Sequence, residues 1–128
     1  MITSNEVKNL TSDELLMLFE ELKTNNTVQN LSLSSKKLGP SVAGEIAKFI
    51  KENTTIINLD LTGNLLGDSG TVLIAESLKH NKTIKSIILM ANQIGNVGME
   101  AITNALMINT TITNIDLAFN NLGNKGME

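Results

Sequence analysis

The chain contains no cysteine, arginine, tryptophan or tyrosine, and His80 is the single histidine among its 128 residues. The missing cysteines exclude disulfides, thiolate nucleophiles and cysteine-ligated zinc, and one histidine cannot build a histidine-rich metal site. Three phenylalanines are the only aromatic residues, and the formal net charge is -3. A nucleic-acid surface needs a basic stripe or a stacking platform, so the sequence predicts no nucleic-acid partner. It also predicts no metal and no cofactor.

Long apolar runs are also missing. No stretch approaches the roughly 20 residues that cross a bilayer, and residues 1–10 have no basic start followed by an apolar segment, as a standard signal peptide would. We therefore expect no membrane partner, and either a cytoplasmic protein or an effector exported without a standard signal peptide. The hydrophobic share of 41%, against 18% charged residues, is enough for one buried core and excludes intrinsic disorder.

The sequence does contain a repeat of 28 residues. Several columns of matched residues recur at this period without a gap. Chance can align one such column but not several of different chemistry, so the chain is an array of similar units. The columns are Leu31, Leu59, Ile87 and Ile115; Leu33, Leu61, Leu89 and Leu117; Leu38, Leu66, Ile94 and Leu122; Gly39, Gly67, Gly95 and Gly123; Asn25, Asn53, Asn81 and Asn109; Asn64, Asn92 and Asn120; and Gly70, Gly98 and Gly126.

The first half of each unit is predicted to form a short strand. In residues 55–64, apolar Ile57, Leu59 and Leu61 alternate with polar residues. This two-residue period is typical of a strand with one buried face and one solvated face. The glycine that follows the strand, Gly67 in this unit, marks a tight turn.

The second half of each unit predicts an amphipathic helix of about three turns. Leu73, Ile74 and Leu78 have helical spacing, and Asp68 stands where a side chain can cap the helix N-terminus. The asparagine after the helix, Asn81 in this unit, tolerates the left-handed conformation that commonly ends helices. Each unit is therefore a strand, a turn and a helix.

Such a unit cannot close a core alone, so neighbouring units must stack and bury each other. Strands in a sheet lie closer together than packed helices, so the stack bends with its strands on the inner face. The predicted fold class is α/β: a solenoid shaped as a horseshoe segment, with a concave parallel β-sheet and convex helices.

The motif LxLxxNxLG occurs as LDLTGNLLG at residues 59–67, as ILMANQIG at residues 88–95 with Ile87 opening the motif, and as IDLAFNNLG at residues 115–123. It resembles the leucine-rich repeat family. The 28-residue unit with a full helix resembles the ribonuclease-inhibitor subtype, which also occurs in NOD-like receptors, tropomodulins and the Ran GTPase-activating protein. The resemblance implies a leucine-rich-repeat solenoid with a ladder of side chains bonded to backbone groups of neighbouring units, formed by Asn64, Asn92 and Asn120.

The N-terminal residues 1–24 resemble a degenerate half repeat. Thr11 and Glu14 form a capping-box pattern ahead of an apolar run, which predicts a helix over residues 12–23. We expect this helix to cover the open end of the core, as terminal caps do in repeat proteins. Lys36 replaces the ladder asparagine in the first unit, so water or the N-terminal segment is expected to bond the backbone there.

We expect the repeats to occupy residues 25–128, with the last repeat truncated. Its strand, residues 111–117, is expected to have one unpaired edge, with incomplete helix cover beside it. Residues after Asn120 are expected to be poorly ordered unless another molecule covers this end. A homodimer through the uncapped C-terminal repeat is one way to cover it.

The concave face is the candidate partner-binding surface. Ile88 and Met90 are predicted to point outward from one strand as an apolar patch, with Asp60 and Asp116 on the strands to either side. Drift within one unit is the alternative explanation of the patch, and plain solvation is the alternative for the polar rows. The candidate residues are Asn58, Asp60, Thr62, Ser86, Ile88, Met90, Asn114, Asp116 and Phe119.

The sequence favours a non-catalytic protein-interaction module. Asp60 and Asp116 lie two strands apart, roughly 9 to 10 Å, with Ile88 between them and no third ligand, which opposes glycosidase or metal chemistry. We therefore predict that the protein is not an enzyme. Two alternatives remain open: a GTPase-activating regulator resembling the Ran GTPase-activating protein, although no loop residue here matches that activity, and a purely structural segment of a longer array.

Overall fold

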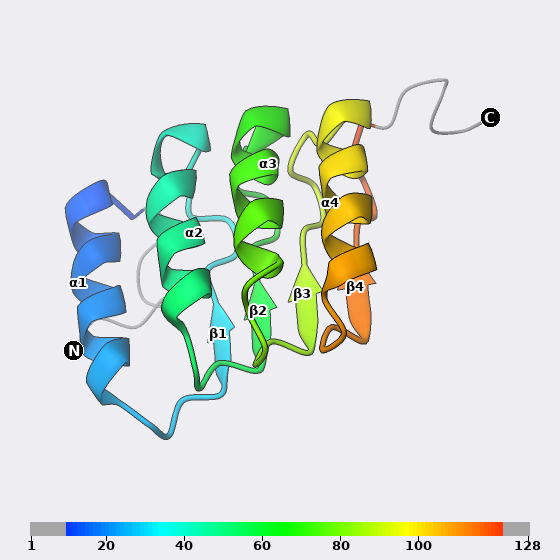
Figure 1. The fold of residues 1–128 in the computed structure, drawn as a ribbon. Helices are drawn as coiled ribbons and strands as arrows, with labels where there is room; N and C mark the ends of the chain where they lie inside the picture. Colours follow the sequence, from blue (N-terminus) through cyan, green and yellow to red (C-terminus); the bar gives the residue numbers. More distant parts are fainter. Residues whose placement is uncertain (1–9, 122–128) are drawn as a thin grey trace.

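A computed structural model of the chain describes residues 10–121. Figure 1 shows its four helices side by side in one layer and its four strands side by side in another. This alternation is the α/β arrangement that the repeat predicts. In sequence order, the elements are α1 (Ser12–Thr24), β1 (Asn30–Ser32), the 3-10 turn η2 (Pro40–Val42), α2 (Ala43–Glu52), β2 (Asn58–Asp60), α3 (Gly67–Leu78), β3 (Ser86–Ile88), α4 (Asn96–Ile108) and β4 (Asn114–Asp116).

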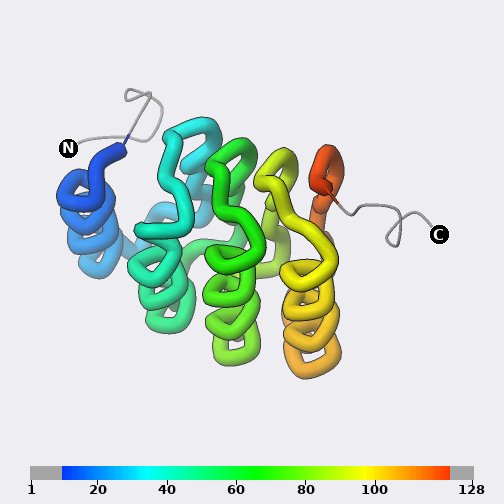
Figure 2. Tube along the Cα trace, turned by 90° about the horizontal axis from the view of Figure 1, so that it is seen from above, coloured from blue at the N-terminus to red at the C-terminus, as the bar shows by residue number. Residues whose placement is uncertain are grey.

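The strands form one parallel sheet in the order β1-β2-β3-β4. Paired residues are 28 positions apart, so that Asn58 lies between Asn30 and Ser86. The helices are spaced more widely than the strands in Figure 1, and Figure 2 shows the units stacked in one row. The sheet therefore lies on the concave side and the helices lie on the convex side, as predicted.

The core lies between the two layers. Leu59 and Ile74 are 1% and 0% exposed, as the strand and helix patterns predict. Leu73, which was grouped with Ile74 and Leu78 in the amphipathic helix, is 46% exposed, because its side chain points about 100° away from that of Ile74 around the helix. Ile57 is only partly buried while Ile56 is fully buried, because the strand alternation does not extend into the turn before β2.

The asparagine ladder between units is confirmed. The side chain of Asn92 is fully buried; its Oδ1 accepts the Asn64 N–H at 2.9 Å, and its Nδ2 donates to the Leu61 carbonyl at 2.8 Å. The equivalent asparagines of the units before and after make matching bonds. In the first unit, the Leu10 N–H donates to the Lys36 carbonyl at 3.2 Å, so the N-terminal segment takes part there as expected.

A second asparagine ladder, not foreseen from the sequence, runs along the helix ends. The Oδ1 of Asn81 accepts the Ile84 N–H at 2.7 Å, and its Nδ2 donates to the Ile50 carbonyl of the previous unit at 2.8 Å. Asn109 repeats this pattern one unit later. The expected left-handed conformation is wrong, because Asn53 and Asn109 have φ of -72° and -76° with extended backbone. The role of these asparagines is therefore to hydrogen-bond the turn after each helix to the previous unit.

Asp68 caps the helix of the next unit and not its own. Helix α3 has Leu66 at its N-cap with no side-chain cap bond. The Oδ1 of Asp68 instead accepts the N–H groups of Gly95 and Gly98, at 2.7 Å and 2.9 Å, where α4 begins. A Cβ on Gly98 would lie 2.8 Å from that oxygen, so a glycine is needed for this close approach. The capping bond thus links neighbouring units.

The N-terminal helix has the predicted start and close to the predicted length. The Thr11 Oγ1 accepts the Glu14 N–H at 3.2 Å, and the Glu14 Oε1 accepts the Thr11 N–H at 3.1 Å, which completes the capping box. The Phe19 ring of α1 stacks on the Phe49 ring of α2, with centroids 4.2 Å apart. Helix α1 therefore lies against the first full unit, while the division into a cap over residues 1–24 and repeats over residues 25–128 stays a prediction.

The C-terminal end of the described stack is open. Within residues 10–121, no strand pairs with the outer edge of β4. The predicted behaviour of the chain after Asn120 falls mainly on residues 122–128, which lie outside the described residues. Four apolar side chains at this end of the stack are partly exposed where their counterparts 28 residues earlier are fully buried: Leu106, Ile112, Ile115 and Leu117, against Leu78, Ile84, Ile87 and Leu89.

Candidate protein-binding surface on the sheet

The predicted binding residues all reach solvent, and none is buried. The strand alternation explains this outcome, since Ile88 is partly exposed while its neighbours Ile87 and Leu89 are 0% exposed. The fully exposed members are Asn58, Asn114 and Phe119, and the partly exposed members are Asp60, Thr62, Ser86, Ile88, Met90 and Asp116.

The strand register brings the central residues together. Asp60 pairs with Ile88, and Ile88 pairs with Asp116, so the apolar side chain lies between two carboxylates. Met90 follows two residues later, on the same face of the sheet. Phe119 is not in these paired rows; it lies in the turn after β4, with φ of 59° and 82% exposure. We call Asp60, Ile88, Met90 and Asp116 together the acidic-apolar centre.

The two carboxylates are held by their own backbone turns. The Oδ1 of Asp60 accepts the Thr62 N–H at 2.9 Å and the Thr62 hydroxyl at 2.6 Å. The Oδ1 of Asp116 accepts the Ala118 N–H at 3.0 Å. These Asx turns are a structural role that the sequence reasoning missed, and they fix each carboxylate beside Ile88. Ile88 cannot make such a turn, so its side chain serves no comparable backbone purpose.

The outer row of the sheet is bonded across the strands. The Asn58 Nδ2 donates to the Asn30 Oδ1, and the Asn114 Nδ2 donates to the Ser86 Oγ at 3.1 Å. Amide and hydroxyl groups that bond one another in this way form an ordinary solvated row. Asn58, Ser86 and Asn114 therefore border the acidic-apolar centre without adding charge.

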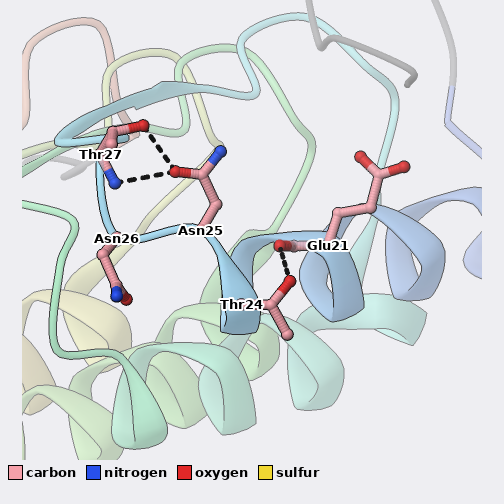
Figure 3. Close-up of a pocket in the computed structure, with 5 residues that line it drawn as sticks. All are labelled: Glu21, Thr24, Asn25, Asn26 and Thr27. Atoms are coloured by element: carbon pink, nitrogen blue, oxygen red, sulfur yellow. Dashed lines mark hydrogen bonds between the residues drawn. The ribbon is translucent and has the colours of Figure 1, made fainter.

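A shallow, open depression lies beside the turn between α1 and β1 (Figure 3). It is lined by Glu21, Thr24, Asn25, Asn26 and Thr27. The Thr24 hydroxyl donates to the Glu21 carbonyl at 3.1 Å, and the Asn25 Oδ1 accepts the Thr27 N–H at 2.8 Å and the Thr27 hydroxyl at 2.7 Å. These bonds make a local turn, and no polar side chain in the depression is buried. The depression has the chemistry of a loop surface.

Two ion pairs lie on the convex side, at the C-terminal ends of α1 and α3. The Lys79 Nζ lies 2.9 Å from the Glu76 carboxylate, and this hydrogen bond lowers the pKa of Glu76. The bond between Lys23 and Glu20, at 3.0 Å, raises the pKa of Lys23. Exposed pairs of this kind contribute little stability. Among residues 10–121, no three carboxylate or imidazole groups are placed to share a metal ion, and no helix there is long and apolar enough to cross a membrane.

The end of α4 carries exposed apolar residues that were not singled out from the sequence. Met107 and Ile108 are 80% and 56% exposed. The column of Met107 holds lysine in the three earlier units, at Lys23, Lys51 and Lys79. The replacement of a charged residue by methionine in this column is a sequence signal that could have indicated the exposed apolar residues. It places an apolar surface beside the open C-terminal end of the stack.

Comparison with known proteins gives one family. The Leucine Rich repeat family model matches residues 52–75, 80–102 and 109–128, more than half of the chain. A search of curated proteins finds no match. Among solved structures, the chain is similar to "Leiomodin-1 Actin-Binding Site 2 (ABS2)", with a TM-score of 0.77 and 25% identity; the similarity covers 84% of this chain, which spans 65% of the length of that one. The chain belongs to the leucine-rich repeat family.

Proposed function

We propose that the protein is a non-catalytic protein-interaction module that docks its partner on the concave sheet. The observation that carries the proposal is the register of Ile88, an apolar side chain open to solvent between Asp60 and Asp116. Partly exposed apolar groups rimmed by charge are typical of docking surfaces. Asn58, Ser86 and Asn114 provide the polar border of this surface.

The similar solved structure supports the class of partner. That protein is named as an actin-binding site, so a protein ligand is consistent with this arrangement of repeats, and actin is one partner to test. The 28-residue spacing of the strand pairs and the helix that follows each of β1, β2 and β3 support the ribonuclease-inhibitor-like subtype. The GTPase-activating alternative has no supporting residue, and an assay of GTP hydrolysis by candidate GTPases tests it.

The experiment for the proposal is affinity capture with two matched variants. Ile88→Lys places a charge in the acidic-apolar centre, whereas Val97→Lys makes the same kind of change at a 61% exposed residue of α4. We expect proteins captured by the unchanged chain, actin included where it binds, to be retained by Val97→Lys and lost with Ile88→Lys. A set of captured proteins that survives Ile88→Lys would place the binding surface elsewhere.

We also propose that the chain self-associates through its last unit. The partly exposed core residues Ile115 and Leu117 and the open edge of β4 support this proposal, because a second copy can pair the edge and cover the apolar side chains in a two-fold contact that closes. Sedimentation at increasing concentration tests it: the sedimentation coefficient is expected to rise toward that of a dimer.

A further inference from the structure

We infer that the partner presents an amphipathic α-helix to the concave sheet, laid across the strands, with basic residues on both sides of an apolar one. This inference rests on the proposed function and adds the chemical and geometric class of the ligand. It is carried by the register Asp60–Ile88–Asp116 and by the absence of basic residues from the outward rows. These rows are Asn30, Ser32, Ser34, Asn58, Asp60, Thr62, Ser86, Ile88, Met90, Asn114, Asp116 and Ala118.

The spacing of the three central residues matches a helix. Neighbouring strands lie about 4.8 Å apart, so Ile88 is about 4.8 Å from the strand of each aspartate, and the two aspartates are about 9.6 Å apart. Along a helix, residues three or four positions apart rise about 4.5 to 6 Å, and residues seven apart rise about 10.5 Å on nearly the same face. A helix with basic residues at i and i+7 and apolar residues at i+3 and i+4 therefore matches all three side chains.

Other regular conformations do not match this spacing. An extended strand presents side chains to one face about every 6.7 Å, which fits neither interval. A polyproline II segment returns to the same face about every 9.3 Å, so it can meet Asp60 and Asp116 but leaves Ile88 without a facing side chain. Among regular backbones, the helix is the one that places a residue opposite each of the three.

The dimensions of the sheet agree with this ligand. Four strands span about 14 Å across the sheet, the length of a helix of roughly ten residues. Along the strand, Met90 lies about 6.7 Å beyond Ile88, within the 10 to 12 Å diameter of a helix with its side chains. One helix can thus cover both apolar residues of the acidic-apolar centre.

The charge of the centre selects the flanking residues of the ligand. Each aspartate uses its Oδ1 in an Asx turn, which orients the carboxylate and leaves the second oxygen available to a donor on the ligand. Lysine or arginine on the ligand complements this pair, and the apolar residue between them covers Ile88. Opposite charges across the surface fix the position of the helix, and burial of the apolar residues supplies affinity.

The test uses three synthetic peptides of 14 residues and related composition. The matched peptide is a side-chain-linked helix with Lys at positions 3 and 10 and Leu at positions 6 and 7. The second peptide moves the leucines to the face opposite the lysines, and the third replaces the central turn with prolines so that it is extended. Fluorescence anisotropy at low salt is expected to show the matched helix binding at least tenfold more tightly than either control. Equal binding of all three, or no binding of the matched helix at 1 mM, would overturn the helix inference.

Four variants of the protein locate the bound peptide. Asp60→Asn and Asp116→Asn keep the Oδ1 acceptor of each turn and remove the charge, so each should weaken the matched helix by about two- to fivefold, which follows from an exposed ion pair. Ile88→Lys should weaken binding at least tenfold, and Val97→Lys should leave it unchanged. If the extended peptide binds best and Ile88→Lys weakens it, the docking surface stands and the helix inference fails. If every peptide binds Ile88→Lys normally, the proposed function fails as well.

Discussion

Removal of the Asn92 side chain should destabilise the stack from its interior. In Asn92→Ala, the Asn64 N–H loses its acceptor at 2.9 Å, and the Leu66 N–H loses a longer bond at 3.4 Å. The carbonyl of Leu61 loses one donor but still accepts the Asn64 Nδ2 at 3.0 Å. The carbonyl of Met90 likewise keeps a bond from a backbone N–H. The net loss is therefore one well-buried N–H group and part of a second.

An unsatisfied buried N–H costs about 1–3 kcal/mol, so we expect Asn92→Ala to lower the free energy of unfolding by about 2 kcal/mol. For a domain of this size, that loss corresponds to a fall in Tm of roughly 8 °C. Urea titration followed by circular dichroism measures the free energy, and thermal melting gives the Tm. Asn120→Ala should cost about half as much, because its bonds at the open end are only partly buried.

Asn104→Ala provides the matched control. Asn104 is exposed within α4, and alanine is the better helix former by a few tenths of a kcal/mol, so this variant should be neutral or slightly more stable. Equal melting of Asn92→Ala and Asn104→Ala would refute the structural role of the ladder.

Three further changes test other parts of the stack. Ile88→Lys should fold with nearly unchanged Tm, whereas Leu89→Lys buries a charge in the core and should unfold the chain; the reverse result by circular dichroism would mean that the strand register is off by one. Asp68→Ala removes the cap between units and should lower the free energy of unfolding by about 1 kcal/mol in urea titration, and Asp68→Asn should recover part of that loss. An unchanged urea midpoint in Asp68→Ala would contradict the capping role. Phe119→Lys should weaken self-association in sedimentation without lowering Tm; an unchanged chain that stays monomeric at high concentration would contradict the dimer.

Most of the fold could be predicted because the repeat carries it. One 28-residue period determines the order of elements, the parallel register and the alternation that turns Ile88 outward and Leu89 inward. The ladder through Asn92 was implied by the resemblance to the leucine-rich repeat family. These features depend on local periodicity and on the stacking of like units.

Other features depend on contacts between units and could not be predicted from one unit alone. Asp68 occupies a position that can cap its own helix, and only the stacked structure brings the start of α4 within reach of its carboxylate. Asn81 comes soon after a helix, a position where asparagine commonly adopts the left-handed conformation. Its Nδ2 instead donates to the carbonyl of Ile50, 31 residues earlier. Leu73 belongs to an apolar cluster in sequence, but one step around the helix exposes it.

The binding surface was predictable to the level of its exposed residues. Strand alternation indicates which side chains point outward, but it does not show that Asp60 and Asp116 hold Asx turns. The identity of the partner depends on a second surface that this sequence does not encode.

The central claim is that the concave sheet is the binding surface, and amide chemical-shift mapping of the ¹⁵N-labelled protein with the matched helical peptide tests it most directly. The largest shifts are predicted for the backbone of β2, β3 and β4 around Asp60, Ile88 and Asp116, with little change along the convex faces of α2, α3 and α4. Shifts that cluster on the helices, or none at a peptide concentration that saturates anisotropy, would contradict the claim.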